Sequence, residues 1–321
     1  MTDRAQSDSP RIAVVGAGAV GCYFGGMLAL AGLPVTLIGR RASVDAISRN
    51  QLLITDSSLS QRVTVEASTK IEAVREADVI LLSVKTTDTE VVTPELAAHV
   101  APQAAVLSLQ NGVDNVRRIF TASGISAIPC AVYVSVAITA PGHVTKSGSA
   151  RIILGLPKEA TRDREDIPQK LAQMFNRAGV SCRISQNIEV ELWLKLLWNC
   201  AANAVTALGR ATYGQVARSA LAREMMRAAA MEVVEVARAA GVALPSFELS
   251  DTHIREALDV GDATSSTAQD IIRGKRSEID SLNGYIVARA RELGVKVPVN
   301  QTLYALVKLL EESSARVAIP A

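Results

Sequence analysis

Apolar runs and helical periodicities alternate in the N-terminal part of the chain. The runs are dominated by aliphatic residues, as is typical of strands buried on both faces of a parallel sheet. They lie at residues 11–15, 35–38, 77–84 and 104–109. Helical spacing lies between them, at residues 20–31 and 91–100. This alternation predicts a parallel, doubly wound sheet.

The pattern changes after residue 125. Two β-rich segments follow, 131–139 and 143–155, and Pro141-Gly142 between them is a turn signal. They predict a mixed extension of the sheet. One more helix is expected at residues 166–178 and one more strand at 180–184, and from residue 188 onward the spacing is almost entirely helical.

A glycine-rich loop, Gly16-Ala17-Gly18-Ala19-Val20-Gly21, follows the first predicted strand and opens the first predicted helix. In this context G-x-G-x-x-G is typical of a dinucleotide site. The first glycine permits the tight turn, the second lets the backbone approach a pyrophosphate, and the third allows close packing of helix on sheet. The helix N-terminus then offers N–H groups to the phosphates. The alternative is a tight turn without a ligand.

The end of the second predicted strand indicates which coenzyme the loop would bind. It reads Leu37-Ile38-Gly39-Arg40-Arg41, where NAD-binding proteins usually carry an acidic residue for the ribose hydroxyls. A carboxylate would repel a 2′-phosphate, whereas an arginine pairs with it. We therefore expect NADPH, with Arg40 as the first choice of ligand and Arg41 as the second. The alternative is two solvated surface arginines.

The predicted fold class is therefore α/β, with an N-terminal Rossmann-type doubly wound sheet and an all-helical C-terminal domain. We expect the NADPH-binding domain at residues 11–186 and a helical domain for substrate and dimerisation at 187–321. Residues 1–10 are polar and are expected to form a disordered tail.

A polar stripe runs along a strongly apolar predicted helix. Lys195, Asn199 and Asn203 recur every fourth residue, and Glu191 precedes them by four, so all of them lie on one slowly drifting face. Burying a lysine and two amides without partners would be costly. Either they pair with each other and with the protein, or they line a polar cleft. An ordinary Glu191–Lys195 surface pair is the alternative, but it leaves the asparagines unexplained.

A second polar cluster lies between residues 265 and 280. Ser277 and Asp280 fit the spacing of a capping box, so we expect Ser277 to cap the helix that follows. For Ser266 and Glu278 the residues alone leave two interpretations open, a helix-terminal role and a functional one.

Composition excludes several classes of function. The net charge of +2, without a long run of one sign, argues against a nucleic-acid partner. Only three histidines occur, widely separated, so no metal site is expected. The four cysteines form no C-x-x-C pair and are expected to be buried, reduced thiols. The chain has neither the apolar stretch of a signal peptide nor that of a membrane span, so we expect a cytoplasmic protein that does not bind membranes.

Several motifs occur together along the chain. They are the glycine loop, Gln110-Asn111-Gly112, Glu191-Leu192-Trp193 followed by Lys195, Asn199 and Asn203, Ser265-Ser266 followed by Gln269-Asp270, and Glu278-Ile279-Asp280 followed by Asn283-Gly284. In this order and at this spacing they resemble the ketopantoate reductase (2-dehydropantoate 2-reductase) family, over residues 11–310.

The resemblance implies a role for each matching residue. It makes Lys195 the catalytic general acid and Glu278 the carboxylate that binds the substrate hydroxyl and supports turnover. It places Asn199, Asn203 and Ser266 at the substrate. Asn111 would lie near both substrate and nicotinamide, and Lys85 near the coenzyme.

The activity implied is NADPH-dependent reduction of 2-dehydropantoate to pantoate, a step in pantothenate and coenzyme A biosynthesis. A related reductase of another small 2-keto acid remains an alternative, because Lys275-Arg276-Ser277 replaces an arginine-threonine pair common in the family. A non-catalytic NADPH-binding sensor is the other alternative. The long C-terminal helices, such as residues 221–240, could support a homodimer.

Overall fold

A computed structural model of the protein describes residues 9–156, 165–245, 249–258, 261 and 263–317. Residues 1–8 of the expected disordered tail lie outside these ranges. Contacts divide the chain into two compact units. The first comprises Met1–Gln110 and Asp114–Ile188, and the second comprises Asn111–Val113 and Glu189–Ala321. In the described part of the chain, no helix combines the length and the apolar character that crossing a membrane requires.

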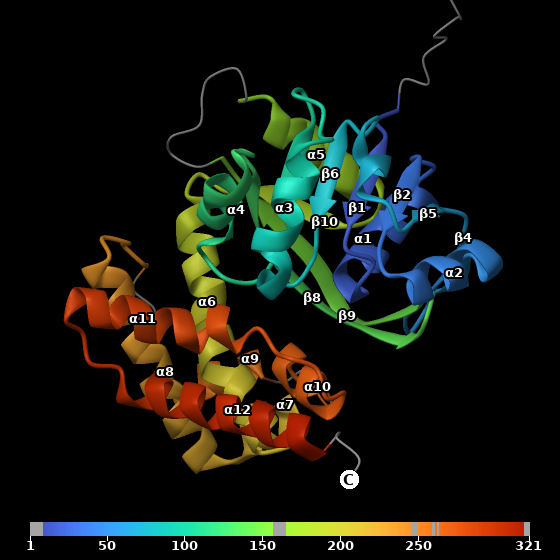
Figure 1. Cartoon of the computed structure of the whole chain (residues 1–321). Coiled ribbons are helices and arrows are strands. Elements are labelled where there is room, and N and C mark those ends of the chain that lie inside the picture. Colours follow the sequence, from blue (N-terminus) through green and yellow to red (C-terminus); the bar gives the residue numbers. More distant parts are fainter. Residues whose placement is uncertain (1–8, 157–164, 246–248, 259–260, 262, 318–321) are drawn as a thin grey trace, which may run out of the picture. The chain divides into compact units, whose positions relative to one another are not determined.

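The first unit is built on a sheet of ten strands (Figure 1). Its central strands run parallel in the order β5-β2-β1-β6-β7, the arrangement of a doubly wound sheet whose strand order reverses between β1 and β6. These strands are β1 (Ile12–Val15), β2 (Val35–Ile38), β5 (Glu66–Ser68), β6 (Val79–Leu82) and β7 (Ala105–Ser108). The predicted Rossmann-type sheet is thus confirmed.

Helices cover both faces of this sheet, and the side chains of β1 show how. Ile12 and Val14 belong to one apolar cluster, whereas Ala13 and Val15 belong to another on the opposite face. The first cluster includes residues of α1 and α5, and the second includes residues of α3 and α4, which also pack against each other (Figure 1). The helices of this unit are α1 (Ala19–Leu30), α2 (Arg41–Asn50), α3 (Thr89–Ala97), α4 (Asn115–Ser123) and α5 (Ile167–Arg177), with short 3-10 turns η1 (Ile71–Val74) and η2 (Thr86–Asp88).

A long hairpin extends the sheet in the mixed fashion that the sequence predicts. β8 (Ile128–Ala140) joins β7 in parallel and then pairs antiparallel with β9 (His143–Leu154). Further strands complete this side: β3 (Leu52–Thr55) and β10 (Ser181–Ile184) lie parallel to β9, and β4 (Ser60–Val63) pairs antiparallel with β3.

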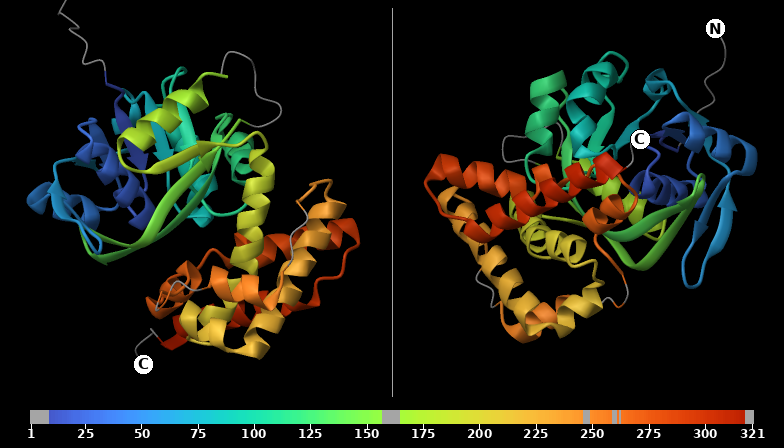
Figure 2. Two further views of the ribbon diagram at one scale, coloured as in Figure 1. Left: turned by 180° about the vertical axis from the view of Figure 1, so that it is seen from behind. Right: turned by 60° about the horizontal axis from the view of Figure 1, so that its bottom comes forward.

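In the residues of the second unit that the structure describes, the regular structure is helical. Its core gathers alanine, valine and leucine side chains from α6, α8, α11 and α12, and the last three pack on one another (Figure 2). The elements that lead into and form this unit are α6 (Ile188–Leu208), α7 (Tyr213–Arg218), α8 (Ala220–Ala239), α9 (Asp251–Ala257), α10 (Ser266–Ile272), η4 (Ile279–Ser281), α11 (Asn283–Leu293) and α12 (Pro298–Val317).

Candidate active site

The glycine loop of the first unit turns from β1 into α1, and its geometry requires glycine at two positions. Gly16 has a φ of 113°, and a Cβ there would lie 2.7 Å from the backbone carbon of Ser83. At Gly21 a Cβ would lie 2.2 Å from the carbonyl oxygen of Gly16. The Ser83 hydroxyl donates to that same oxygen at 2.9 Å, so the loop is held against the end of β6.

The middle of the loop is open where a ligand would approach. A Cβ added at Gly18 would meet no heavy atom within 4 Å. Gly18 precedes the first turn of α1, where Ala19 and Val20 lie, and backbone N–H groups of a first helical turn have no partner within the helix. Ala17 instead donates its N–H to Ile38 at 3.0 Å, which joins the loop to β2. This cradle at the reversal point of the sheet fits the pyrophosphate of a dinucleotide.

The end of β2 presents a guanidinium group next to the glycine loop. Gly39 cannot carry a side chain without displacing Ala17, because a Cβ at Gly39 would lie 2.5 Å from the Cβ of Ala17. Arg40 directly precedes α2, its side chain is 89% exposed, and its Nη2 lies 3.7 Å from Oδ2 of Asp88. Arg41, the first residue of α2, is also exposed. An ion pair this exposed is weak, so Arg40 can exchange Asp88 for another anion.

A buried amide supports the segment that carries Lys85. Lys85 precedes the turn η2, directly after Val84. Gln110 Nε2 donates to the carbonyl oxygen of Val84 at 3.1 Å and to the hydroxyl of Thr89 at 2.8 Å. Arg118 donates to the carbonyl oxygen of Thr86 at 2.7 Å. The sequence singled out Gln110 only as part of a motif, and its bonds show that it fixes the backbone around Lys85.

The second unit brings three of the predicted residues into one hydrogen-bonded chain. Lys195 Nζ on α6 donates to Asn111 Oδ1 at 2.8 Å, and Asn111 Nδ2 donates to Glu278 Oε2 at 3.1 Å. All three side chains are only partly buried. The amide of Asn111 thus links the ammonium group of Lys195 to the carboxylate of Glu278, which follows Lys195 by 83 residues along the chain.

The two neighbours of Asn111 determine how its amide is oriented. An ammonium group only donates hydrogen bonds and a carboxylate only accepts them. Reversing the amide would place its NH₂ group against Lys195 and its oxygen against Glu278, and both contacts would be repulsive. Only one orientation of the amide therefore satisfies both the cation and the anion.

A buried cluster of hydroxyl groups joins Asn203 to the start of α10. Thr206 Oγ1 donates to Ser265 Oγ at 2.6 Å, and Ser265 Oγ donates to the carbonyl oxygen of Asn203 at 3.1 Å. Ser265 Oγ also accepts from the N–H of Ala268 at 3.1 Å and so caps α10. Ser266, the first residue of α10, is exposed, and this network fixes its position relative to Asn203.

Sequence reasoning missed one aromatic residue at Asn203. The hydroxyl of Tyr213 donates to Asn203 Oδ1 at 3.4 Å, and burial raises the pKa of this hydroxyl to about 12. A capping box between Thr212 and Gln215 holds the first turn of α7, on which Tyr213 lies. The Thr212–Gln215 spacing in the sequence is that of a capping box, and it could have predicted the helix start that carries Tyr213. Asn199, between Lys195 and Asn203 on α6, is half-buried.

Two sequence models of one family match the chain. The model described as "Ketopantoate reductase PanE/ApbA" matches residues 12–159, and the model of its C-terminal part matches residues 187–311. Among curated proteins, a 2-dehydropantoate 2-reductase of Pyrococcus abyssi is 33% identical over 304 residues, which cover 93% of this chain and 97% of that protein. A 2-dehydropantoate 2-reductase of Halobacterium salinarum is 30% identical over 94% of this chain and 99% of that protein.

Solved structures share the fold of the whole chain. A PanE/ApbA family ketopantoate reductase from Ralstonia eutropha JMP134 is 40% identical, with a TM-score of 0.86 over 95% of this chain and 99% of that chain. A D-mandelate dehydrogenase solved with NADH and anilino(oxo)acetate has a TM-score of 0.88 at 24% identity, over 95% of this chain and 99% of that chain, and so shares the fold. On these matches, which span both units, the chain belongs to the ketopantoate reductase PanE/ApbA family.

Proposed function

We propose that this protein reduces 2-dehydropantoate to pantoate with NADPH. The observation that carries the proposal is the Lys195–Asn111–Glu278 chain, which holds a cation and a carboxylate in fixed positions within one unit of a ketopantoate reductase family member. Curated relatives that match nearly the whole chain are named for this reaction.

The proposed chemistry uses Lys195 at the ketone oxygen. The bound coenzyme supplies the hydride, and this protein supplies the charge and the proton. Negative charge develops on the ketone oxygen during reduction, and a nearby ammonium group stabilises it and donates a proton. Asn111 accepts a hydrogen bond from Lys195 and donates one to Glu278, so one amide orients both charged groups. In this proposal Lys195 is the general acid.

The remaining predicted residues bind the substrate in this proposal. Glu278 accepts a hydrogen bond from the substrate hydroxyl. Asn199, Asn203 and Ser266 offer amide and hydroxyl groups to the carboxylate and hydroxyl oxygens. The second unit would therefore bind the keto acid, and the first unit would bind the coenzyme through the loop Gly16–Gly21.

NADPH is proposed over NADH because of the side chains at the end of β2. Gly39 offers no carboxylate to the ribose, and the exposed guanidinium of Arg40 is free to leave its weak partner Asp88 for a 2′-phosphate. We expect Arg40→Ala to raise the KM for NADPH at least about tenfold, the loss of one charge-assisted hydrogen bond. The KM for NADH, which has no 2′-phosphate, should stay unchanged. Equal effects on both coenzymes would refute this role of Arg40.

The experiment that tests the function is oxidation of NADPH by the purified protein, followed optically, with 2-dehydropantoate, pyruvate and benzoylformate in parallel. Fast, selective turnover of 2-dehydropantoate is the expected result. Faster turnover of another keto acid would change the substrate and retain the reaction class. Binding of NADPH without turnover of any keto acid would favour a coenzyme-binding sensor.

A further inference from the structure

Glu278 lies in a segment that regular structure does not hold. It connects α10 to α11, and Glu278 itself has φ −96° and ψ 22° at the start of the single turn η4, whose N–H groups its own side chain does not cap. A side chain on such a segment needs support from elsewhere to keep one position. Two groups of contacts, one before and one after Glu278, supply this support.

One anchor lies directly before Glu278. Glu311 Oε1 on α12 accepts hydrogen bonds from the backbone N–H of Ser277 at 2.8 Å and from its hydroxyl at 2.6 Å. Ser277 is completely buried, and its Oγ accepts from the N–H of Ile279 at 3.3 Å. The capping box expected between Ser277 and Asp280 is therefore wrong, because the carboxylate at the N–H of Ser277 comes from α12 and not from Asp280.

A second anchor lies directly after Glu278. Asp280 Oδ1 accepts from the hydroxyl of Tyr304 at 2.7 Å, and Asp280 Oδ2 lies 3.1 Å from Nζ of Lys308. Both partners belong to α12. Arg276 Nη2 also donates to Asp280 Oδ2, at 3.3 Å. Gly284 makes room for the tyrosine, because a Cβ there would lie 2.8 Å from the ring of Tyr304.

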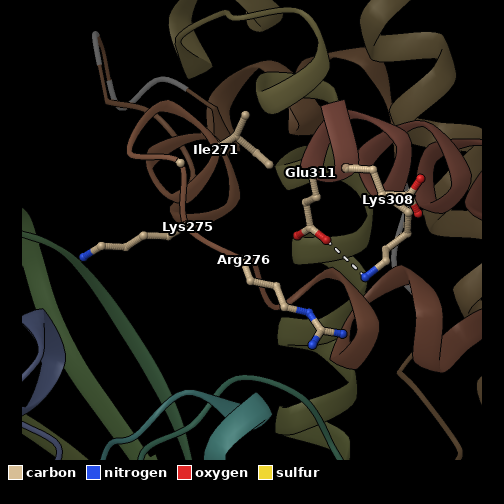
Figure 3. A pocket seen from close by; sticks show the side chains of 7 residues that line it. Ile271, Lys275, Arg276, Lys308 and Glu311 are labelled. Atoms are coloured by element: carbon tan, nitrogen blue, oxygen red, sulfur yellow. Dashed lines mark ion pairs between the residues drawn. The ribbon is translucent and has the colours of Figure 1, made fainter. Parts of the chain in front are cut away.

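Lys308 joins the two anchors into one unit. Its Nζ lies 3.1 Å from Asp280 Oδ2. It also lies 3.1 Å from Glu311 Oε2 (Figure 3). The side chains are largely shielded from water, with exposures of 26% for Lys308, 32% for Asp280 and 10% for Glu311. A shielded network of this kind is stronger and more rigid than isolated surface pairs.

The ionisation of these groups agrees with the network. Burial raises the pKa of Asp280, but hydrogen bonds from Tyr304 and Lys308 outweigh it and the pKa lies below its ordinary value. Burial lowers the pKa of Lys308, yet Glu311 and Asp280 bring it above its ordinary value. Both groups are thus charged at neutral pH.

We propose that Tyr304, Lys308 and Glu311 of α12 are positioning residues, which hold Ser277 and Asp280 on either side of Glu278 and so aim its carboxylate at Asn111. The inference rests on the proposed function, since it assigns these residues a task in turnover only if Glu278 has one. None of them touches the Lys195–Asn111–Glu278 chain through its own hydrogen bonds described above.

A pocket beside these contacts leaves room for substitutions that test the role of α12. The pocket has a volume of about 350 Å³ and is lined by Ile271, Gly274, Lys275, Arg276, Lys308, Glu311 and Glu312. Lys275 extends away from the Lys308–Glu311 pair (Figure 3). A change of polarity at Glu311 can therefore be made without a packing clash. Exposed Glu312, the next residue on the same helix and in the same pocket, provides a matched control.

The experiment compares Glu311→Gln, Ser277→Ala and Tyr304→Phe with Glu312→Gln in the NADPH oxidation assay. We expect the first three to lower kcat by about 10- to 100-fold, the effect of misplacing a reacting group by about 1 Å, with the KM for NADPH unchanged. Glu312→Gln should match the wild type. Ser277→Thr keeps the hydroxyl and should restore most of the turnover lost in Ser277→Ala. Thermal unfolding of each variant verifies that it is folded. Tyr304→Phe removes only the hydroxyl group and keeps the ring, so it still tests the role of α12 if another variant does not fold.

A double-mutant cycle separates positioning from a general loss of stability. In a Glu278→Ala background the three substitutions should lower kcat no further, because they act through Glu278. Full, additive losses in that background, or wild-type kcat in Glu311→Gln and Tyr304→Phe, would overturn the positioning role while the proposed function stands. Wild-type turnover of Glu278→Ala itself would instead remove Glu278 from the proposed function, and the positioning role with it.

Discussion

At the scale of single residues, the site depends on one amide between two opposite charges. Asn111 accepts from Lys195 and donates to Glu278, so this single amide orients both charged groups. The spacing of Lys195 and Asn203 on α6 was visible in the sequence. The contact of Lys195 with Asn111, 84 residues away, was not.

Removing the cation should affect the chemical step above all. We expect Lys195→Ala to lower kcat by roughly 100-fold or more, because both charge stabilisation and proton donation at the ketone oxygen are lost. Steady-state NADPH oxidation measures this. Lys296→Ala, at an exposed lysine, is the control and should be unaffected. A near-wild-type rate in Lys195→Ala would remove Lys195 from the proposed role.

At the scale of elements, buried hydroxyl groups connect helices that carry the substrate-binding candidates. Ser265 caps α10 and at the same time binds the backbone of α6 at Asn203, so the orientation of α10 is tied to the polar face of α6. Thr206 completes the link from within α6. A change at Ser265 should therefore affect both stability and substrate binding.

We expect Ser265→Ala to destabilise the protein by about 1–2 kcal/mol, the usual range for loss of a helix N-cap. The KM for the keto acid should rise, since Ser266 and Asn203 lose their common anchor, while the KM for NADPH should not. Denaturant unfolding and steady-state kinetics measure the two effects. Ser265→Thr, which retains a hydroxyl, serves as the control. An unchanged KM for the keto acid would show that the cap has only a structural role.

The helices and strands differ in how well their sequences predict them. β2 lies at the predicted residues 35–38, a run of four strand-forming residues of which three are buried. β4 gave no signal, because its residues Ser60–Val63 are mostly polar and exposed at the edge of the sheet. Glu311 escaped prediction for another reason: its spacing on α12 resembles that of any solvated helix face, and only the fold brings it to Ser277.

At the scale of the whole molecule, one buried carboxylate ties the last helix to the rest of its unit. Glu232 on α8 accepts from the backbone N–H groups of Val299 and Asn300, each at 2.8 Å, at the start of α12. Asn283 at the start of α11 donates to Asn300 Oδ1 at 2.9 Å and to the carbonyl oxygen of Cys200 at 3.0 Å. The helix that holds Glu278 in position is thus itself anchored at its other end.

Loss of that anchor should weaken the whole second unit. We expect Glu232→Ala to reduce the free energy of unfolding by about 3 kcal/mol or more, because buried N–H groups lose a charged acceptor. Glu235→Ala, at an exposed glutamate three residues along α8, should change it by less than about 0.5 kcal/mol. Denaturant titration of both variants measures the difference. Equal stabilities would contradict the anchoring role.

The assignment of Asn111–Val113 to the second unit has a consequence for gene recombination. A crossover near residue 188 would exchange the helical part of this protein for that of a relative, but it would leave behind the asparagine that contacts Lys195 and Glu278. Such a chimera would inherit its lysine and glutamate from one parent and its asparagine from the other. To transfer Lys195, Asn111 and Glu278 together, recombination must therefore exchange two separate stretches of coding sequence, one for Asn111–Val113 and one for Glu189–Ala321.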